Sequence, residues 1–518
     1  SIRESIMCGF FITNDPLISE SDYEIINKRL SFRGPDFQSG LIKHCGWSLY
    51  HSRLSIIATN PRYSQPFFTP SGGVLVFNGE ILNFSTLAKK YGIVNSKSDT
   101  EVLAALLERK SFDFNLLEGF FSFVYVDKFG ALKNVVRDKF GVKPLVYYKQ
   151  KNVISISSEA SVLSDLYKLN FSKFALEEYK VFRGPIFSGS YFDNVKSVTP
   201  GSCLISGKYF DSTFEIAESY ETFEDLIPAL KEEISNSVKS RLISDVPVGL
   251  LFSSGIDSNL IKHSSNEVFQ CFTGGFEGDY DLDFANKLSS KEINTFKVDK
   301  DEFLERFKNM KELRKEPISV PNEIVLSFLA EKWRAVGGRV LLSGEAADEF
   351  FAGYDNIYYW ALGNENFTVN EFLDRYAYVP SIKVSEDIKE NLKEFFSSLQ
   401  GLSSFEKVRQ FFVKKHLPLL FRRLDYSLMY SGIEGREPLA SSAIYSLAMR
   451  FNPKDLFFKS RGKFPLRTIA SYYLGDEFAY REKVGFPIDV KKIFNGAPSS
   501  NRYDNYSVWS KENLKGII

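Results

Sequence analysis

The stretch from 246 to 258 reads VPVGLLFSSGIDS, an apolar strand that ends in a turn of small residues. Ser253, Ser254 and Gly255 form this turn, and a helix is expected to begin near Asp257. Small residues let backbone N–H groups close around an anion, and a helix N-terminus adds the positive end of a dipole. A carboxylate at Asp257 would repel a bare phosphate, so it favours a Mg²⁺ ion between them. A Ser/Gly turn capped by Asp257 explains the stretch equally well when it is considered alone.

A second apolar strand, 339–342, leads into another Ser-Gly turn at Ser343 and Gly344. Glu345 and Asp348 follow three residues apart, so both are expected to face one site from the first helical turn. Acidic residues in a first turn also stabilise the helix dipole, and for this loop alone that is the better explanation. Two strand ends with small residues and carboxylates together predict a ligand crevice in an open α/β sheet.

The elements around these loops alternate between strand and helix. Apolar residues recur at helical spacing over 223–242. Strands are expected at 246–252, 268–273, 294–298 and 339–342, with helical segments between them. This alternation predicts an α/β doubly wound parallel sheet, and the chain from 371 onward is expected to be mostly helical.

The first part of the chain has a different pattern, with short strand-like runs broken by turn residues. It predicts an α+β domain with antiparallel sheet over residues 8–210. The polar stretch 211–222 is the expected linker, and 223–518 is the expected second domain. A length of 518 residues fits two or three domains.

Composition excludes several classes of protein. Lys plus Arg and Asp plus Glu are both 65, so the net charge is zero and favours neither a nucleic-acid nor a polybasic membrane partner. No apolar run approaches a membrane span and no signal peptide is found, so a cytoplasmic location is expected. The four cysteines, Cys8, Cys45, Cys203 and Cys271, are too scattered for a disulfide framework or a CxxC metal site.

The two loops and a third segment together resemble the asparagine synthetase family. Its phosphate loop reads SGGxDS where this chain has SSGIDS, with Ser254 in place of the first Gly. Its second loop reads SGExxDE, as here from Ser343 to Glu349, and its GKxxLR segment matches 462–467. The resemblance implies ATP and Mg²⁺ as cofactors, with Mg²⁺ held by Asp257 and Asp348. It implies that Glu345 helps to form an acyl-adenylate, that Lys463 stabilises negative charge, and that the nucleotide lies near Leu251, Ser253, Ser254, Gly255, Ser258, Gly274, Ser343 and Gly344.

The first domain resembles the class-II glutamine amidotransferases, which are N-terminal-nucleophile hydrolases. The matching segments are Met7-Cys8-Gly9-Phe10, RGPD (33–36), HSRLSI (51–56), FNGEI (77–81), SDTE (98–101) and RDKFG (137–141). The resemblance implies that Cys8 is the nucleophile, that Asn78 and Gly79 donate to the oxyanion, and that Arg53 binds the glutamine α-carboxylate. Glu80 and Asp99 are implied as partners of the glutamine ammonium group.

This family uses the amine of its N-terminal Cys as the base, but here Ser1 to Met7 precede Cys8. Three explanations stay open. These residues are a remnant of expression, a propeptide removed on maturation, or part of a form with a silent glutaminase.

The acceptor carboxylate also stays open. Where the synthetases have PFLD, this chain has Pro438-Leu-Ala-Ser441. Three hypotheses follow: asparagine synthesis from aspartate, the same chemistry on another carboxylate such as a uronic acid or a natural-product intermediate, and a weakly catalytic regulatory homologue. The intact set of candidate catalytic residues argues against the third. Glutamine, ATP and a carboxylate are the expected partners, and a homodimer stays open.

Overall fold

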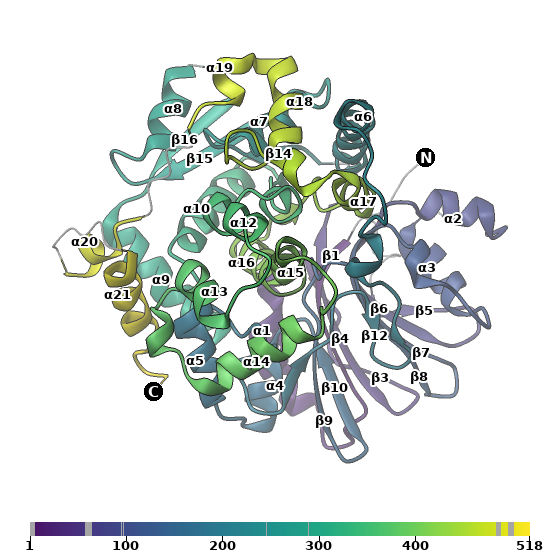
Figure 1. The fold of residues 1–518 in the computed structure, drawn as a ribbon. Coiled ribbons are helices and arrows are strands. Elements are labelled where there is room, and N and C mark those ends of the chain that lie inside the picture. The colour runs from purple at the N-terminus through teal and green to yellow at the C-terminus, as the bar shows by residue number, and fades with distance from the viewer. Residues whose placement is uncertain are drawn as a thin grey trace.

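The computed structural model describes residues 6–56, 65–94, 96, 98–244, 246–288, 290–482, 488–495 and 502–517. Figure 1 shows the strands of the first part gathered on one side of the molecule and the parallel sheet on the other, with helices between them. Among the described residues, no helix combines the length and apolarity needed to cross a membrane.

The N-terminal sheet is antiparallel and is built around β1 (Ile6–Thr13). β1 pairs with β4 (Trp47–Ser55) and β10 (Val153–Ser157), and it meets β6 (Val74–Ile81) at one position. β6 pairs with β7 (Gly119–Val126) and is buried at every position, because side chains cover both of its faces. The other strands are β2 (Phe37–Gln38), β3 (Ile42–His44), β5 (Phe67–Phe68), β8 (Leu132–Arg137), β9 (Val146–Gln150), β11 (Val195–Ser197), β12 (Ser202–Cys203) and β13 (Gly207–Lys208).

Helices cover both outer faces of this strand layer. α1 (Tyr23–Leu30) and α4 (Ala160–Tyr167) pack on the β1 side, while α2 (Phe84–Lys90) and α3 (Asp99–Leu107) pack on β6 and β7. A third apolar cluster is formed by side chains of the strands themselves. It includes Phe10 of β1, Leu49 of β4, Val76 of β6 and Val124 of β7. The predicted α+β glutaminase-type domain, with antiparallel sheets between helices, is confirmed.

The second sheet is parallel, in the order β16 (Ile293–Lys297), β15 (Gln270–Gly275), β14 (Val248–Leu251), β17 (Val340–Leu342) and β18 (Glu434–Arg436). Its helices are α6 (Phe223–Arg241), α7 (Ile256–His263), α8 (Tyr280–Leu288), α9 (Lys300–Arg314) and α10 (Asn322–Ala335). The strand order reverses between β14 and β17, so the loops after these two strands flank a crevice. The four predicted strands are confirmed.

The C-terminal part is mostly helical, as predicted, but it also supplies β18, which the sequence analysis missed. Three residues between a turn and a proline are too few to show strand periodicity. The helices are α11 (Ala347–Phe350), α12 (Asp355–Leu362), α13 (Val369–Tyr376), α14 (Glu386–Ser397), α15 (Ser404–Phe411), α16 (Leu417–Met429), α17 (Ser442–Arg450), α18 (Phe464–Leu474), α19 (Asp476–Ala479), α20 (Val490–Asn495) and α21 (Arg502–Leu514), with a π-helical turn at Phe412–His416.

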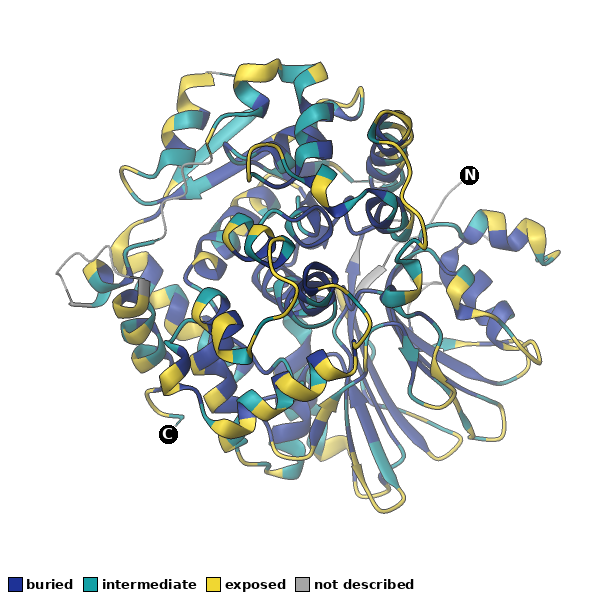
Figure 2. Cartoon of the chain, viewed as in Figure 1, coloured by how far each residue is buried: buried dark blue, intermediate teal, exposed yellow. Residues whose placement is uncertain are grey.

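The two parts share one large apolar cluster. Phe120, Phe140 and Phe210 from the first part pack in the same cluster as Phe350 and Tyr445 from the second. Figure 2 shows that the strands of the first part and the central helices are largely buried, while α14 and α2 have both buried and exposed residues. Within the predicted linker, Ser212 is buried, and Thr222 caps α6. The domain boundaries at 210 and 223 stay a prediction.

Candidate functional site

Cys8 lies on β1 and is fully buried. Its backbone N–H donates to Asn78 Oδ1 at 3.2 Å, and the β1–β4 register places it opposite Arg53. Burial raises the pKa of the Cys8 thiol well above its ordinary value, although Arg53 and Arg33 oppose the shift. The thiol is therefore protonated near neutral pH, and a base has to remove its proton before it can attack.

The Cys8 nitrogen is a peptide nitrogen in this chain, because β1 continues through Ile6 and Met7. Ile6 takes the register position opposite Gly79. A peptide nitrogen has no basic lone pair, so the base role predicted for the Cys8 amine requires a chain whose first residue is Cys8.

Asn78 and Gly79 lie beside Cys8 on β6. Asn78 Nδ2 is buried and has no hydrogen-bond partner within the parts of the chain that the structure describes. Gly79 has φ +121°, and a Cβ atom there would lie 2.0 Å from Phe120 O. The strand therefore requires glycine at this position. An open amide donor next to a thiol is the geometry that an oxyanion needs.

The other residues predicted to bind glutamine have protein partners. Glu80 Oε2 lies 3.1 Å from Arg436 Nη2 of β18. Asp99 begins α3 and accepts the N–H groups of Ile81 at 3.0 Å and Thr100 at 2.8 Å. Asp99 thus ties α3 to β6, and Glu80 ties β6 to the parallel sheet. Their contact with a glutamine ammonium group stays a prediction.

A cavity of about 510 Å³ opens where β14 and β17 end. An adjoining cavity of about 380 Å³ shares Asp257 and Asp348 with it. The larger cavity is lined by nine of the predicted residues: Leu251, Ser253, Asp257, Ser258, Gly274, Ser343, Gly344, Glu345 and Asp348. The smaller one is lined by Ser254, Gly255 and Lys463. The structure thus brings every residue predicted for the nucleotide half to one pair of cavities.

The backbone N–H groups of the phosphate loop are satisfied by protein oxygens. Ser253 N–H donates to Ser258 Oγ at 3.1 Å, Gly255 N–H to Ser253 Oγ at 3.1 Å, and Ser254 N–H to Asp281 Oδ1 at 2.7 Å. An anion bound by these N–H groups has to replace those acceptors. Asp281 was missed by the sequence analysis, because an acid in the first turn of a helix, here α8, is ordinarily a partner of the helix dipole.

Lys463 bridges the two acidic loops. Its Nζ lies 2.7 Å from Asp257 Oδ2 and 2.7 Å from Asp348 Oδ1. Burial opposes the charged form, but the two carboxylates outweigh it and hold the pKa of Lys463 above its ordinary value. Glycine permits this approach, since a Cβ atom on Gly353 would lie 1.9 Å from Asp348 Oδ1 and 2.2 Å from Lys463 Cε.

The carboxylates of Asp257 and Asp348 fit a Mg²⁺ ion that also binds phosphate oxygens. Asp257 Oδ1 is buried and lacks a hydrogen-bond partner among the described residues, so one carboxylate oxygen is open toward the site. No group of three or more His, Cys, Asp or Glu within those residues is arranged to hold a metal. Two carboxylates with substrate phosphates are the ligands that Mg²⁺ commonly takes in nucleotide enzymes.

The placement of Glu345 in a first helical turn is wrong. α11 begins at Ala347, and Ala346 has φ +79°, so the backbone turns sharply between Glu345 and Asp348. Both side chains still line the larger cavity. The loop conformation, not helical spacing, brings them to one site.

Behind the acidic loop lies a buried polar cluster that the sequence analysis missed. Tyr354 Oη donates to Glu349 Oε1 at 2.6 Å and lies 3.2 Å from His416 Nε2. Tyr376 Oη lies 2.7 Å from His416 Nδ1. Burial, together with Asp348 and Glu345, raises the pKa of Glu349 to about 8. Burial lowers the pKa of His416 to about 3, so His416 is neutral.

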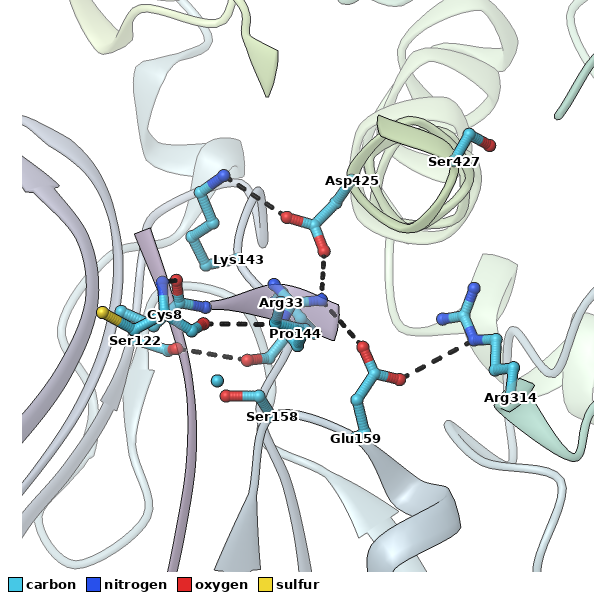
Figure 3. A network of polar contacts seen from close by, with 12 residues as sticks. Cys8, Arg33, Ser122, Lys143, Pro144, Ser158, Glu159, Arg314, Asp425 and Ser427 are labelled. Atoms are coloured by element: carbon cyan, nitrogen blue, oxygen red, sulfur yellow. Dashed lines mark hydrogen bonds and ion pairs between the residues drawn. The ribbon is translucent and has the colours of Figure 1, made fainter. Parts of the chain in front are cut away.

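A second buried network joins Cys8 to the helical part of the chain (Figure 3). Arg33 Nε donates to Cys8 O at 3.4 Å, and Arg33 Nη1 pairs with Glu159 at 2.7 Å and with Asp425 of α16 at 2.8 Å. Lys143 Nζ lies 3.4 Å from the other oxygen of Asp425. The network gives Cys8 a charged connection to the helix that also lines the larger cavity.

The segment Lys483-Val-Gly-Phe-Pro487, which matches the synthetases in sequence, lies outside the described residues. Of the departing segment, Leu439 and Ala440 are buried, and Ser441 precedes α17. None of these three residues lines the two cavities.

Comparison with known proteins accounts for both halves. A glutamine amidotransferase domain model matches residues 7–215, and an asparagine synthase model matches 229–513. The glutamine-hydrolysing asparagine synthetase 1 of Bacillus subtilis is 27% identical, over 94% of this chain and 87% of its own length. Asparagine synthetase B of Escherichia coli is 25% identical, over 93% and 82%. The amidase chry2 of Gibberella zeae is 27% identical, over 67% and 60%. The chain therefore belongs to the asparagine synthase family, as a glutamine-hydrolysing amidotransferase with an N-terminal glutaminase domain.

Proposed function

We propose that this protein takes ammonia from glutamine at Cys8 and uses it to amidate a carboxylate that ATP has activated, with release of AMP and pyrophosphate. The observation that carries the proposal is the position of Lys463 between Asp257 and Asp348, where the two cavities meet. Two carboxylates beyond the ends of β14 and β17, bridged by a lysine from the start of α18, suit a site in which phosphates are bound and displaced.

In the first half-reaction, Arg53 holds the α-carboxylate of glutamine and the Cys8 thiolate attacks the side-chain amide carbon. Asn78 Nδ2 and the Gly79 N–H donate to the oxyanion that forms. Ammonia leaves, and water hydrolyses the remaining thioester to glutamate. The Cys8 amine serves as the base in a chain that begins at Cys8.

In the second half-reaction, an oxygen of the acceptor carboxylate attacks the α-phosphorus of ATP and displaces pyrophosphate. Glu345 lies at this site and takes part in forming the adenylate. Asp257 and Asp348 would hold Mg²⁺, which neutralises phosphate charge when it is bound. Ammonia then attacks the acyl carbon and AMP leaves, while Lys463 stabilises the negative oxygen and the departing phosphate.

Aspartate is the proposed acceptor, with asparagine as the product. The second candidate is another carboxylate, and it is supported by relatives that carry the name amidase. The altered segment 439–441 does not favour this second candidate, because it lies outside both cavities. Pyrophosphate and AMP release would be measured with glutamine, ATP and a panel of carboxylic acids. Aspartate should give the highest kcat/KM, and equal use of an unrelated acid would favour the second candidate.

A further inference from the structure

A third cavity, of about 180 Å³, lies between the first part of the chain and the helical part. Lysines line it from both sides: Lys139 and Lys208 come from the first part, and Lys414 and Lys415 come from the π-helical turn. Among the described residues, this cavity shares no lining residue with the two cavities beside β14 and β17. The proposed mechanism uses none of these four lysines.

One carboxylate in the lining serves two of the lysines. Asp211 Oδ2 lies 2.8 Å from Lys208 Nζ, and Asp211 Oδ1 lies 2.7 Å from Lys414 Nζ. Burial opposes the charged form of Asp211, but the two lysines outweigh it and hold its pKa well below the ordinary value. Lys139 Nζ pairs separately with Glu118 Oε1 at 2.7 Å. Two ammonium groups thus share one carboxylate, which leaves one positive charge unbalanced.

Lys415 adds a second positive charge. Its Nζ lies 4.7 Å from the ring centre of Phe187 and 5.8 Å from that of Phe395. Within the part of the chain that the structure describes, this ammonium group has no hydrogen bond and no ion pair. Burial lowers the pKa of Lys415 and Lys414 lowers it further, while Glu178 opposes the shift.

Glu178 does not balance this charge fully, because its carboxylate is engaged elsewhere. It accepts the N–H groups of Phe187 at 2.6 Å and Ser188 at 3.1 Å, and the Ser188 hydroxyl also donates to it. Burial raises the pKa of Glu178 to about 7, although these hydrogen bonds and Lys415 oppose the shift. Near neutral pH, Glu178 is therefore ionised in only part of the molecules. An excess of positive charge at a partly buried site is costly, and a bound anion would relieve it.

The size and the walls of the cavity limit the kind of anion. Its volume is below the about 300–1,000 Å³ that sites for drug-sized ligands have, so it admits a small ion and excludes a nucleotide. An ammonium group is a point charge with three donors, which suits a compact oxyanion without the planar geometry that arginine recognises. Phe210, Phe395 and Val413 also line the cavity, and apolar walls strengthen an electrostatic contact by lowering the local dielectric constant.

We propose that this cavity binds a phosphate-type dianion through Lys208, Lys414 and Lys415. Such an anion would connect the first part of the chain to the turn Phe412–His416. His416 of the same turn lies 3.2 Å from Tyr354 Oη, in the polar cluster behind the acidic loop. The inference goes beyond the proposed function and does not depend on it.

The first experiment measures phosphate binding by calorimetry at pH 7.5. A saturating non-hydrolysable ATP analogue with Mg²⁺ is present, so that the phosphate-binding groups beside β14 and β17 are occupied. The wild-type protein should bind one phosphate per chain, and binding should weaken as NaCl is added. Glycerol 3-phosphate in place of phosphate separates the two sources of such a dianion. Tighter binding of phosphate would indicate the free ion, and tighter binding of the ester would indicate a small phosphorylated metabolite.

Lys415→Met should weaken phosphate binding by about tenfold or more, since one charged hydrogen bond accounts for at least that factor. Lys415→Arg keeps the charge and should keep part of the affinity. Lys393→Met is the matched control, because Lys393 is an exposed lysine of α14 that pairs with Glu390 at 2.9 Å. It should bind phosphate as the wild type does.

Thermal unfolding gives a second measurement, because a ligand that binds the folded chain raises Tm. Phosphate should raise the Tm of the wild type and of Lys393→Met, at constant ionic strength, more than it raises that of Lys415→Met. In phosphate-free buffer, Lys415→Met should unfold at or above the wild-type temperature, because an unbalanced charge has been removed. The proposal is overturned if the wild type binds no phosphate at millimolar concentration while the nucleotide analogue is bound. It is overturned equally if Lys415→Met binds phosphate as tightly as the wild type, or if Lys393→Met loses as much affinity.

Discussion

Arg436 Nη2 lies 3.1 Å from Glu80 Oε2, and this ion pair joins the edge of the parallel sheet to the strand beside Cys8. Both side chains are almost completely buried. Arg436 lies on β18, which pairs with β17 at the edge of the parallel sheet. Glu80 directly follows Gly79 on β6. A shift of β18 would therefore act on the strand that carries the predicted oxyanion donors.

Further hydrogen bonds and an ion pair hold the Arg436 guanidinium in this position. Its Nε also pairs with Glu434, and its Nη1 donates to the carbonyl groups of Arg241 and Ile243 at 2.7 Å each. Removing one partner of a buried ion pair costs about 3–5 kcal/mol, because the other charge stays buried. The relative position of the two sheets is thus held by a group that tolerates little displacement.

Replacing Cys8 by Ala should abolish glutamine hydrolysis and leave synthesis from ammonium largely intact. The reason is that Cys8 lies in the antiparallel sheet, whereas the Lys463 site lies beyond the ends of the parallel strands β14 and β17, and the two sites use different substrates. Glutamate release and ammonium-dependent pyrophosphate release would be measured in parallel. Cys203→Ala is the control, because Cys203 is a buried cysteine of the same domain outside the candidate site. Wild-type glutamate release by Cys8→Ala would exclude Cys8 as the nucleophile.

Replacing Asp257 or Asp348 by Asn should remove adenylation, with a loss of about a hundredfold or more, because each change weakens both the Mg²⁺ site and the Lys463 contact. ATP–pyrophosphate exchange in the presence of the acceptor is the measurement. Glutamine hydrolysis should persist in both variants. Full exchange activity in both would show that these carboxylates do not hold the metal.

Several parts of this site could be predicted because each leaves a local pattern. The strands before Ser253 and Ser343 are short apolar runs that end in small residues, and such runs are recognisable without knowledge of their neighbours. Contacts between distant segments leave no such pattern. Lys463 is an ordinary lysine by composition, His416 stands in a helical stretch with no special spacing, and β18 is too short to show periodicity.

Gly353→Ala should reduce adenylation as strongly as a change at Asp348, because its Cβ atom would overlap Asp348 Oδ1 and Lys463 Cε. Contacts below 3 Å force these two side chains apart. Gly363→Ala is the matched control, since the nearest atom to a Cβ there is 3.7 Å away. ATP–pyrophosphate exchange should fall for the first variant and stay near wild type for the second. Equal activity would mean that the Lys463–Asp348 contact is dispensable for adenylation.

Glu349 should make stability fall as pH rises. Its pKa is about 8 in the folded chain, because of burial and the nearby Asp348 and Glu345, against about 4.3 when unfolded. The folded chain therefore binds more protons, and its stability declines between these two values. Glu349→Gln keeps an acceptor for Tyr354 Oη but removes the titration.

The measurement for Glu349 is the thermal unfolding temperature between pH 5 and pH 8.5. The difference between Glu349→Gln and wild type should shift in favour of the variant as pH rises. Glu394→Gln, at an exposed helical position, should show no such trend. A difference that is constant over the whole range would place the folded pKa of Glu349 near its ordinary value.

The last prediction concerns the route of ammonia between the two half-reactions. Ammonia in water near pH 7 is almost wholly ammonium, which is not a nucleophile, so transfer through a water-excluded space keeps it reactive. An apolar cluster that includes Phe120, Phe140 and Phe350 is shared by both parts of the chain, and the buried Arg33–Asp425 pair joins the strand of Cys8 to α16, which lines the larger cavity. With amide-labelled glutamine and excess unlabelled ammonium, the product amide should carry mainly the label. Cys8→Ala, given the same mixture, should incorporate only unlabelled nitrogen. A product dominated by unlabelled nitrogen in the wild-type protein, while glutamine is being hydrolysed, would mean that ammonia passes through bulk water.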